Sequence, residues 1–179
     1  MVLQTERLIL REMGSADYAD LAAMLKDPAV MYAYEHAFTD QEVWDWLNRQ
    51  RARYARHGFG LWAAVRKSTG EMVGQAGLTM QPCEGEEVLE IGYLLKKAFW
   101  HRGYAREAAA GCRDYAFQKL GAPKVHAIIK TDNAPSIQVA RAVGMKPEKE
   151  FTARYYSGER RHYLFSLSSP TRPAVRLEP

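Results

Sequence analysis

A glycine at the start of a predicted helix carries the clearest chemical signal in the sequence. Gly103 follows a strand-like run and a short basic and aromatic link, and it precedes a long amphipathic stretch. The first amides of a helix lack intrahelical partners and together carry about half a positive charge, so this point favours an anion. Glycine lets backbone amides approach an anion with no Cβ in the way. Basic side chains surround the point: Lys96, Lys97, His101, Arg102 and Arg106.

A phosphate group is the anion that fits this pattern best. The alternative is that Gly103 simply caps an ordinary helix. The segment lacks the Gly-Lys-Ser/Thr of a nucleotide-binding P-loop, and its single glycine does not make a dinucleotide fingerprint.

Periodicity predicts the elements that must position this segment. Alternation and β-forming residues predict strands over 7–11, 59–65, 72–79, 88–95, 124–130, 151–156 and 161–167. Apolar residues at helical spacing predict helices over 15–26, 39–57, 103–119 and 133–143. Ser15 is the expected N-cap of the first helix, and Thr39 with Glu42 forms a capping box at the second.

The element order predicts a mixed α/β, or α+β, architecture. A meander of strands comes first, then a strand-helix-strand crossover, then a terminal hairpin. The crossover through the long helix should be right-handed and make its two strands parallel. We expect one domain over residues 1–168 and a C-terminal surface tail over 169–179, which holds three prolines.

Composition narrows the class of protein. The chain has 179 residues and is 47% hydrophobic, enough for a single folded core. The net charge of +4 mildly favours an anionic partner, but 25 basic residues are interspersed with 21 acidic ones, unlike the basic stripe of a nucleic-acid reader. Cys83 and Cys112 have no metal-ligand spacing, so we expect no metal. With no signal peptide and no long apolar run, the expected location is cytoplasmic, away from membranes.

Two motifs resemble one protein family. The segment from Trp100 to Ala105, WHRGYA, resembles the [QRW]-x-x-G-x-[GA] pyrophosphate loop of GNAT acetyltransferases. The stretch from Asn133-Ala134-Pro135-Ser136 to Gly144-Met145 is similar to a second element of that family, N-x-x-[AS] followed by G-F. Together with the opening TERLILR, the resemblance covers roughly residues 3 to 168, and it looks closest to the Rim-type ribosomal-protein N-terminal acetyltransferases.

The resemblance implies a GNAT fold and acetyl-CoA as the acetyl donor. The implied fold has a central mixed, mostly antiparallel sheet of about seven strands, with a splayed parallel pair and about four flanking helices. The implied contacts to CoA come from the strand end, the loop and the second motif: Tyr93, Leu94, Leu95, Lys97, His101, Arg102, Gly103, Tyr104, Ala105, Arg106, Asn133 and Ser136. Asn133 can equally be the N-cap of the helix that follows it.

Glu90 and Ser136 are the catalytic residues that the resemblance suggests. An acceptor amine must lose a proton before it attacks, and a carboxylate at the active end of a strand could take that proton directly or through water. The other interpretation of Glu90 is a surface residue. Many GNAT enzymes carry a tyrosine that protonates the leaving thiolate, but the matching position here is Ala140. Ser136, a water or another tyrosine could replace it, or the thiolate could leave unassisted.

The acceptor should lie across the cofactor from the pyrophosphate loop. Candidate contacts come from the link between the first two helices and from the final hairpin: Met31, Tyr32, Tyr34, Glu35 and Tyr155. The sequence therefore predicts an N-acetyltransferase that modifies a primary amine, on a protein N-terminus or a small molecule, in a ternary complex. A non-catalytic acyl-CoA sensor and, more weakly, an RNA-binding domain are the alternatives. The expected oligomeric state is a monomer or homodimer.

Overall fold

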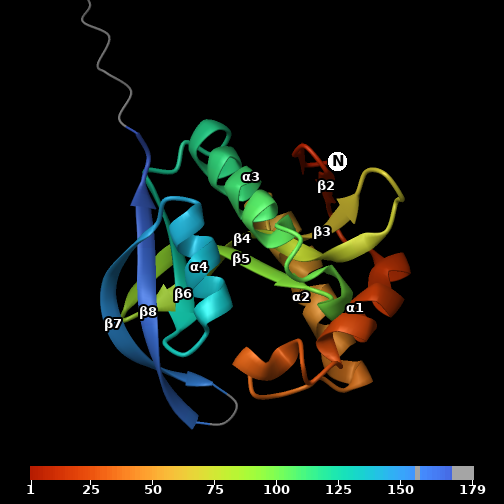
Figure 1. Ribbon diagram of the computed structural model, residues 1–179, viewed down its shortest axis with the longest axis horizontal. Helices are drawn as coiled ribbons and strands as arrows, with labels where there is room; N and C mark the ends of the chain where they lie inside the picture. The colour runs from red at the N-terminus through yellow and green to blue at the C-terminus, as the bar shows by residue number, and fades with distance from the viewer. Residues whose placement is uncertain (156–157, 171–179) are drawn as a thin grey trace, which may run out of the picture.

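One eight-stranded sheet organises the chain, as the computed structural model shows for residues 1–155 and 158–170 (Figure 1). The strand order is β1-β2-β3-β4-β5-β6-β8-β7, and every neighbouring pair is antiparallel except β5 with β6. The strands are β1 (Leu3–Gln4), β2 (Leu8–Arg11), β3 (Leu61–Arg66), β4 (Met72–Cys83), β5 (Glu86–Leu95), β6 (Lys124–Lys130), β7 (Lys146–Tyr155) and β8 (Gly158–Ser168).

Helices cover both faces of this sheet. The α-helices are α1 (Tyr18–Leu25), α2 (Asp40–His57), α3 (Tyr104–Gln118) and α4 (Ala134–Ala142), with short 3-10 helices η1 (Ser15–Asp17), η2 (Met31–Ala33) and η3 (Lys97–Phe99). In Figure 1, α3 and α4 lie in front of the central strands and α2 lies behind them. The mixed α/β architecture predicted from the sequence is confirmed, with eight strands where about seven were expected, because the two-residue β1 adds one.

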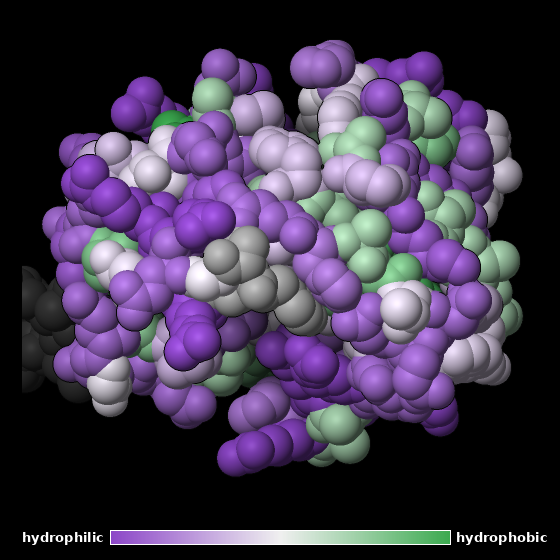
Figure 2. Space-filling model, turned by 90° about the horizontal axis from the view of Figure 1, so that it is seen from below, coloured by the Kyte–Doolittle hydropathy of each residue, from purple (hydrophilic) through white to green (hydrophobic). Residues whose placement is uncertain are grey.

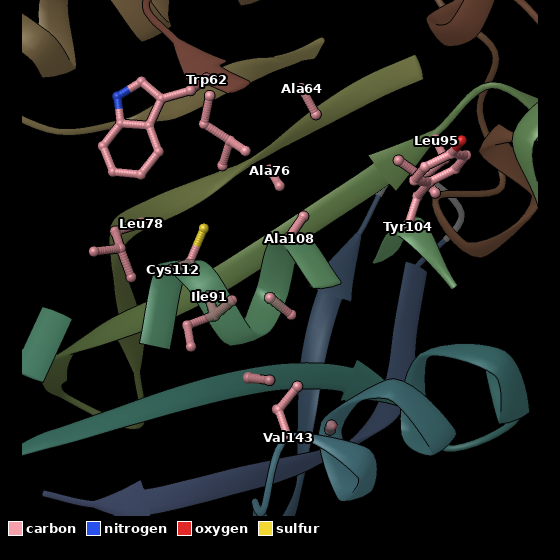
Figure 3. Close-up of a cluster of buried hydrophobic side chains, with 14 of the residues drawn as sticks. Trp62, Ala64, Ala76, Leu78, Ile91, Leu95, Tyr104, Ala108, Cys112 and Val143 are labelled. Atoms are coloured by element: carbon pink, nitrogen blue, oxygen red, sulfur yellow. The ribbon is translucent and has the colours of Figure 1, made fainter. Parts of the chain in front are cut away.

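The small side chains of α3 let this helix pack closely on the sheet. Ala108 and Cys112 face Ile91 and Ala76 in a buried cluster (Figure 3). Each of these four side chains is at most 2% exposed. Close packing of α3 fixes the direction in which its N-terminus points, and the loop before it is held at the end of β5.

The predicted elements match the structure at most boundaries, with three differences. The strand expected to stop at 79 continues to Cys83, and the one expected from 151 starts at Lys146, because each pairs with its neighbour along its whole length. Ser15 is not an N-cap: it lies within η1, whose cap is Gly14. The capping box of Thr39 and Glu42 is confirmed. Most of the predicted tail, 171–179, lies outside the described residues.

β5 and β6 meet at one point and then diverge. Glu90 opposite His126 is the single register pair between them in the described part of the chain, whereas β5 pairs with β4 along its full length. The main-chain groups of β5 that face β6 beyond Glu90 therefore have no strand partner on that side. No helix of the described residues is long and apolar enough to cross a membrane.

Candidate active site

A cavity of about 1060 Å³ opens where β5 and β6 diverge. Its walls come from β4, β5, β6, α2, α4, the link between α1 and α2, and the β7–β8 hairpin. Figure 2 views the molecule from the end that carries the link and the hairpin, where mainly hydrophilic residues alternate with smaller hydrophobic areas. The volume suits a substantial ligand, since small-molecule sites typically span about 300–1,000 Å³.

Glu90 lies at the point of divergence and lines the cavity. Its Oε1 accepts the backbone N–H of Ile128 on β6 at 3.2 Å, and its Oε2 accepts the hydroxyl of Thr79 on β4 at 3.3 Å. Burial raises the pKa of Glu90 to about 7, against the lowering effect of these hydrogen bonds and of Arg53. A carboxyl group that is half ionised near neutral pH can act as a general base.

The loop before α3 has the geometry of an anion site. Gly103 is the N-cap of α3 in the left-handed conformation, with φ of 78°, and His101 before it also has a positive φ of 59°. The amides of Tyr104, Ala105 and Arg106 start the helix, so they have no carbonyl four residues back within it. All five of these residues line the cavity.

Arg7 holds this loop from outside the cavity. Its Nε lies 2.6 Å from Oε2 of Glu107, and its Nη1 donates to the backbone carbonyl of Arg102 at 3.0 Å. The guanidinium also stacks 4.5 Å from the ring centroid of Tyr104. Thr5 adds a hydroxyl hydrogen bond of 2.5 Å to Glu107. The sequence pattern singled out the TERLILR segment only as a landmark and did not indicate that it clamps the loop.

Asn133 and Ser136 hold the start of α4 against the cavity. Oδ1 of Asn133 accepts the Ser136 amide at 3.2 Å, which makes it the N-cap, and accepts the Tyr32 hydroxyl at 2.7 Å. The Tyr93 hydroxyl donates to the Ser136 carbonyl at 2.9 Å, so β5 is tied to α4 across the gap. Burial raises the pKa of the Tyr93 phenol. Ala140 is 1% exposed, packs in the core and does not line the cavity.

Most of the predicted cofactor residues come together in this cavity, and two do not. Ten line it: Tyr93, Leu94, Leu95, His101, Gly103, Tyr104, Ala105, Arg106, Asn133 and Ser136. Lys97 in η3 and Arg102 are exposed and lie outside the lining. Arg102 places its guanidinium 5.8 Å from the ring centroid of Phe99, so it sits over the outer side of the loop.

Some of the residues predicted to contact the acceptor line the cavity and others do not. Tyr32 and Tyr34 line the cavity. Met31 does not: its side chain is 1% exposed and packs in the core beneath α1 and α2, which corrects the expectation that it contacts the acceptor. Glu35 lies outside the lining, where it pairs with Lys130 and with Arg160. The side chain of Tyr155 lies outside the described part of the structure.

Several residues of the acceptor side were not foreseen from the sequence. They are Trp46, Arg49 and Arg53 of α2, Gln75, Thr79 and Gln81 of β4, and Phe151 and His162 of the hairpin. The indole N–H of Trp46 donates to Oε1 of Gln75 at 2.9 Å, which fixes α2 over the sheet. The strand predicted from the sequence stopped at Thr79, and only the register of β4 with β5 shows that Thr79 and Gln81 lie on the face of Glu90.

Comparisons with known proteins identify the family. A family model described as an acetyltransferase (GNAT) domain matches residues 7–146 of this chain. The chain belongs to the GNAT acetyltransferase family. The uncharacterized protein YkkB of Bacillus subtilis is 38% identical over 148 residues, covering 82% of this chain and 86% of that protein. The uncharacterized N-acetyltransferase p20 of Bacillus licheniformis is 30% identical over 174 residues, covering 92% of this chain and 94% of that protein.

Solved GNAT structures share the architecture. An acetyltransferase of the GNAT family from Bacillus anthracis superposes with a TM-score of 0.80 at 23% identity, covering 94% of this chain and 98% of that chain. An acetyltransferase from Agrobacterium tumefaciens superposes with a TM-score of 0.79 at 27% identity, covering 93% and 94%. This GNAT protein is therefore an acyltransferase that uses acetyl-CoA as its cosubstrate.

The cavity of this GNAT acetyltransferase fits that cosubstrate. The residues that begin α3 line the cavity and their first amides lack helical partners, so this end of the helix suits a diphosphate. From Glu90 to Leu95 the strand advances about 17 Å at ~3.3 Å per residue, which spans from the carboxylate toward the loop. In residues 1–155 and 158–170 no three His, Cys, Asp or Glu side chains group as metal ligands.

Proposed function

We propose that this GNAT protein is an N-acetyltransferase in which Glu90 receives the proton of a primary amine acceptor during direct attack in a ternary complex. Acetyl-CoA supplies an activated acyl group in its thioester. The observation that carries the proposal is the placement of Glu90, whose carboxylate bridges β4 and β6 at the point where the sheet opens and whose pKa lies near 7. No covalent bond between the acetyl group and the protein is needed.

Binding of the cosubstrate is assigned to the diverging strand and the loop. The amides of Tyr104, Ala105 and Arg106 would hold the diphosphate. The main-chain groups of β5 from Tyr93 to Leu95 would bond the pantetheine arm on the side that β6 leaves open. Asn133 and Ser136 would flank that arm from α4. Lys97 and Arg102, being exposed beside the loop, are suited only to the outer part of the nucleotide, such as its 3′-phosphate.

The amine proton passes to Glu90, and three sources can supply the proton that the CoA thiolate needs. The N–C bond forms as the C–S bond breaks, and the amine proton passes to Glu90. The thiolate then takes a proton from Glu90 through water, from the Ser136 hydroxyl, or from solvent after it leaves. A thiol pKa near 8.5 makes unassisted departure feasible, so Ala140 does not prevent turnover.

Two acceptor classes follow from the family. The resemblance to Rim-type enzymes favours a protein N-terminal α-amine, and other GNAT enzymes act on small-molecule amines. The ordinary pKa of an α-amine, about 8, leaves a larger neutral fraction at pH 7 than that of a lysine at about 10.4. The link and the hairpin, which lie on the acceptor side of the cavity, are the segments that would contact either one.

The experiment that tests the proposal separates catalysis from sensing. Acetyl-CoA is mixed with the protein and a panel of amines, thiol release is measured, and CoA binding is measured separately by calorimetry. We expect amine-dependent thiol release that Glu90→Gln greatly reduces while CoA affinity stays within about threefold. Intact CoA binding without thiol release across the panel would instead identify a non-catalytic acyl-CoA sensor.

A further inference from the structure

The acceptor side of the cavity has an excess of positive charge. Glu90 is the only acidic side chain among the described residues that line it. Three arginines line the same cavity: Arg49 and Arg53 from α2 and Arg154 from the hairpin. Lys130 also lines the cavity, but its charge is neutralised by ion pairs with Glu35 and Asp132.

Arg49 and Arg53 form no ion pair with a carboxylate in the part of the chain that the structure describes. Arg53 donates from Nη1 to Oε1 of Gln50 at 3.2 Å, and Arg49 places its guanidinium 5.6 Å from the ring centroid of Trp46. By contrast, Arg11 at the end of β2 has a carboxylate partner, Asp17, at 2.7 Å. The two guanidinium groups of α2 are therefore available to a ligand.

The spacing of these two arginines is unfavourable without an anion. Like charges four residues apart on a helix repel, which destabilises the helix. Burial and the neighbouring charge of Arg49 lower the pKa of Arg53 from its ordinary value. An anion between the two guanidinium groups would relieve this repulsion and form charge-assisted hydrogen bonds with the planar donors of arginine.

The charges also have an order along the cavity. Arg53 and Glu90 act on each other electrostatically, since Arg53 lowers the pKa of Glu90 and Glu90 raises that of Arg53. The amine would lie at Glu90, and Arg53 of α2 is the arginine whose charge acts on that carboxyl group. Aromatic side chains stand between and around these groups: Tyr34, Phe38, Trp46 and Phe151.

We propose that the acceptor is an amine that also carries an anionic group, a carboxylate or a phosphate, and that Arg53 and Arg49 bind that group while Glu90 faces the amine. This inference rests on the proposed function and narrows its substrate class. It disfavours polyamines, because their further ammonium groups would face the arginines.

The test compares matched acceptors that differ only in the anion. The pairs are L-phenylalanine with 2-phenylethylamine, and γ-aminobutyrate with butylamine. 3-Aminopropylphosphonate probes the phosphate alternative, and spermidine probes a cationic acceptor. For wild type we expect at least one member that carries the anion to exceed its partner without the anion at least tenfold in kcat/KM, mainly through KM. We expect Arg53→Gln to reduce the difference in kcat/KM between the two members of that pair to about twofold.

Arg51→Gln is the matched control, because Arg51 lies on the same helix, is exposed and does not line the cavity. It should keep the wild-type preference. If Arg53→Gln fails to fold, Arg49→Gln, an exposed substitution, serves in its place. If wild type acetylates the amines that lack an anionic group, spermidine included, as fast as the others or faster, the inference is overturned and the proposed function stays intact.

A binding measurement decides the matter even if no amine of the panel is acetylated. Calorimetry with 3-phenylpropionate and 3-phosphonopropionate, added to the protein saturated with CoA, should show binding that Arg53→Gln weakens at least tenfold and Arg51→Gln does not. Absence of binding, or binding that Arg53→Gln leaves unchanged, would overturn the inference. Failure of thiol release alone would count against the proposed function.

Discussion

Arg7 and Glu107 are 100 residues apart in the sequence, and their side chains meet at 2.6 Å behind the pyrophosphate loop. The pair joins the segment between β1 and β2 to the first turn of α3, and Arg7 also donates to the carbonyl of Arg102. The loop therefore has a support on the side away from the cavity. Its shape is set by tertiary contacts as well as by the glycine.

Arg7→Met should weaken acetyl-CoA binding without slowing the chemical step. Loss of the guanidinium removes hydrogen bonds to Glu107 and to the loop carbonyl, but Arg7 is 42% exposed, so we expect only about a three- to tenfold rise in the KM for acetyl-CoA. The kcat should stay within about twofold. Steady-state kinetics check this, with Arg161→Met as the control, since Arg161 pairs with Glu150 between β8 and β7 and does not line the cavity. A fall in kcat with an unchanged KM for acetyl-CoA would contradict the role of Arg7 as a support of the loop.

Gly103→Glu should abolish CoA binding in calorimetry. The new side chain would carry negative charge to the helix N-terminus that is assigned to the diphosphate. Gly70→Glu is the matched control, because Gly70 has a φ of 71° against 78° at Gly103 and has no atom within 4 Å of its added Cβ. Both substitutions strain a left-handed residue by ~1 kcal/mol. Wild-type affinity in the Gly103 variant would show that the anion binds elsewhere.

Glu90→Gln should lower kcat/KM by about a hundredfold or more and change its pH dependence. With an alkylamine acceptor whose pKa is about 10, both the carboxyl group and the amine must lose a proton below pH 7. The logarithm of wild-type kcat/KM should therefore rise with a slope of about two below pH 7 and about one above it. The variant should show a slope of about one throughout. An unchanged break near pH 7 in the variant would assign that ionisation to another group.

Glu90 should also make folding stability depend on pH. Its pKa in the folded protein, about 7, is above the ordinary value of 4.5, so the folded state holds the proton more tightly than the unfolded state. The resulting stability is complete below about pH 4.5 and is lost as pH rises through 7. Urea unfolding should show that the free energy of unfolding of Glu90→Gln falls less than that of wild type between pH 5 and 8, by a few kcal/mol at most. Parallel curves would mean that the carboxyl group is not desolvated.

Asn133→Ala should destabilise the protein by ~1 kcal/mol, because it removes the N-cap of α4. Asn133→Asp keeps an acceptor oxygen for the Ser136 amide and should recover most of that loss. Tyr32→Phe removes the partner hydroxyl at 2.7 Å but leaves the cap, so its stability should stay close to wild type. Chemical denaturation of the three variants measures this order, and a Tyr32→Phe loss as large as that of Asn133→Ala would show that the link supports the fold.

The sequence could predict those parts of the site that depend on local geometry. Gly103 and Asn133 were recognisable because a left-handed cap and an N-cap are properties of a few neighbouring residues. Glu90, which lies inside the predicted strand 88–95, was recognisable from the family resemblance rather than from local geometry. The periodicity likewise predicted nearly every helix and strand, since amphipathic spacing reports which face is buried.

Residues whose role depends on distant partners could not be predicted in this way. Arg53 looks like any charged residue of an amphipathic helix until α2 is seen to cover the cavity beside Glu90. Met31 and Tyr32 are adjacent in the link, yet one is buried in the core and the other reaches Asn133. In a short 3-10 helix no periodic pattern indicates which side faces the ligand.

Because β5 diverges from β6, the cosubstrate has a structural role as well as a chemical one. Between Glu90 and Leu95 the sheet is short of one ladder of hydrogen bonds, and an extended pantetheine arm has the amides and carbonyls to complete it. Acetyl-CoA would then stand in for the missing strand and join the two halves of the sheet. The free energy of unfolding of this enzyme would therefore increase with the concentration of acetyl-CoA, [L], by RT ln(1 + [L]/Kd).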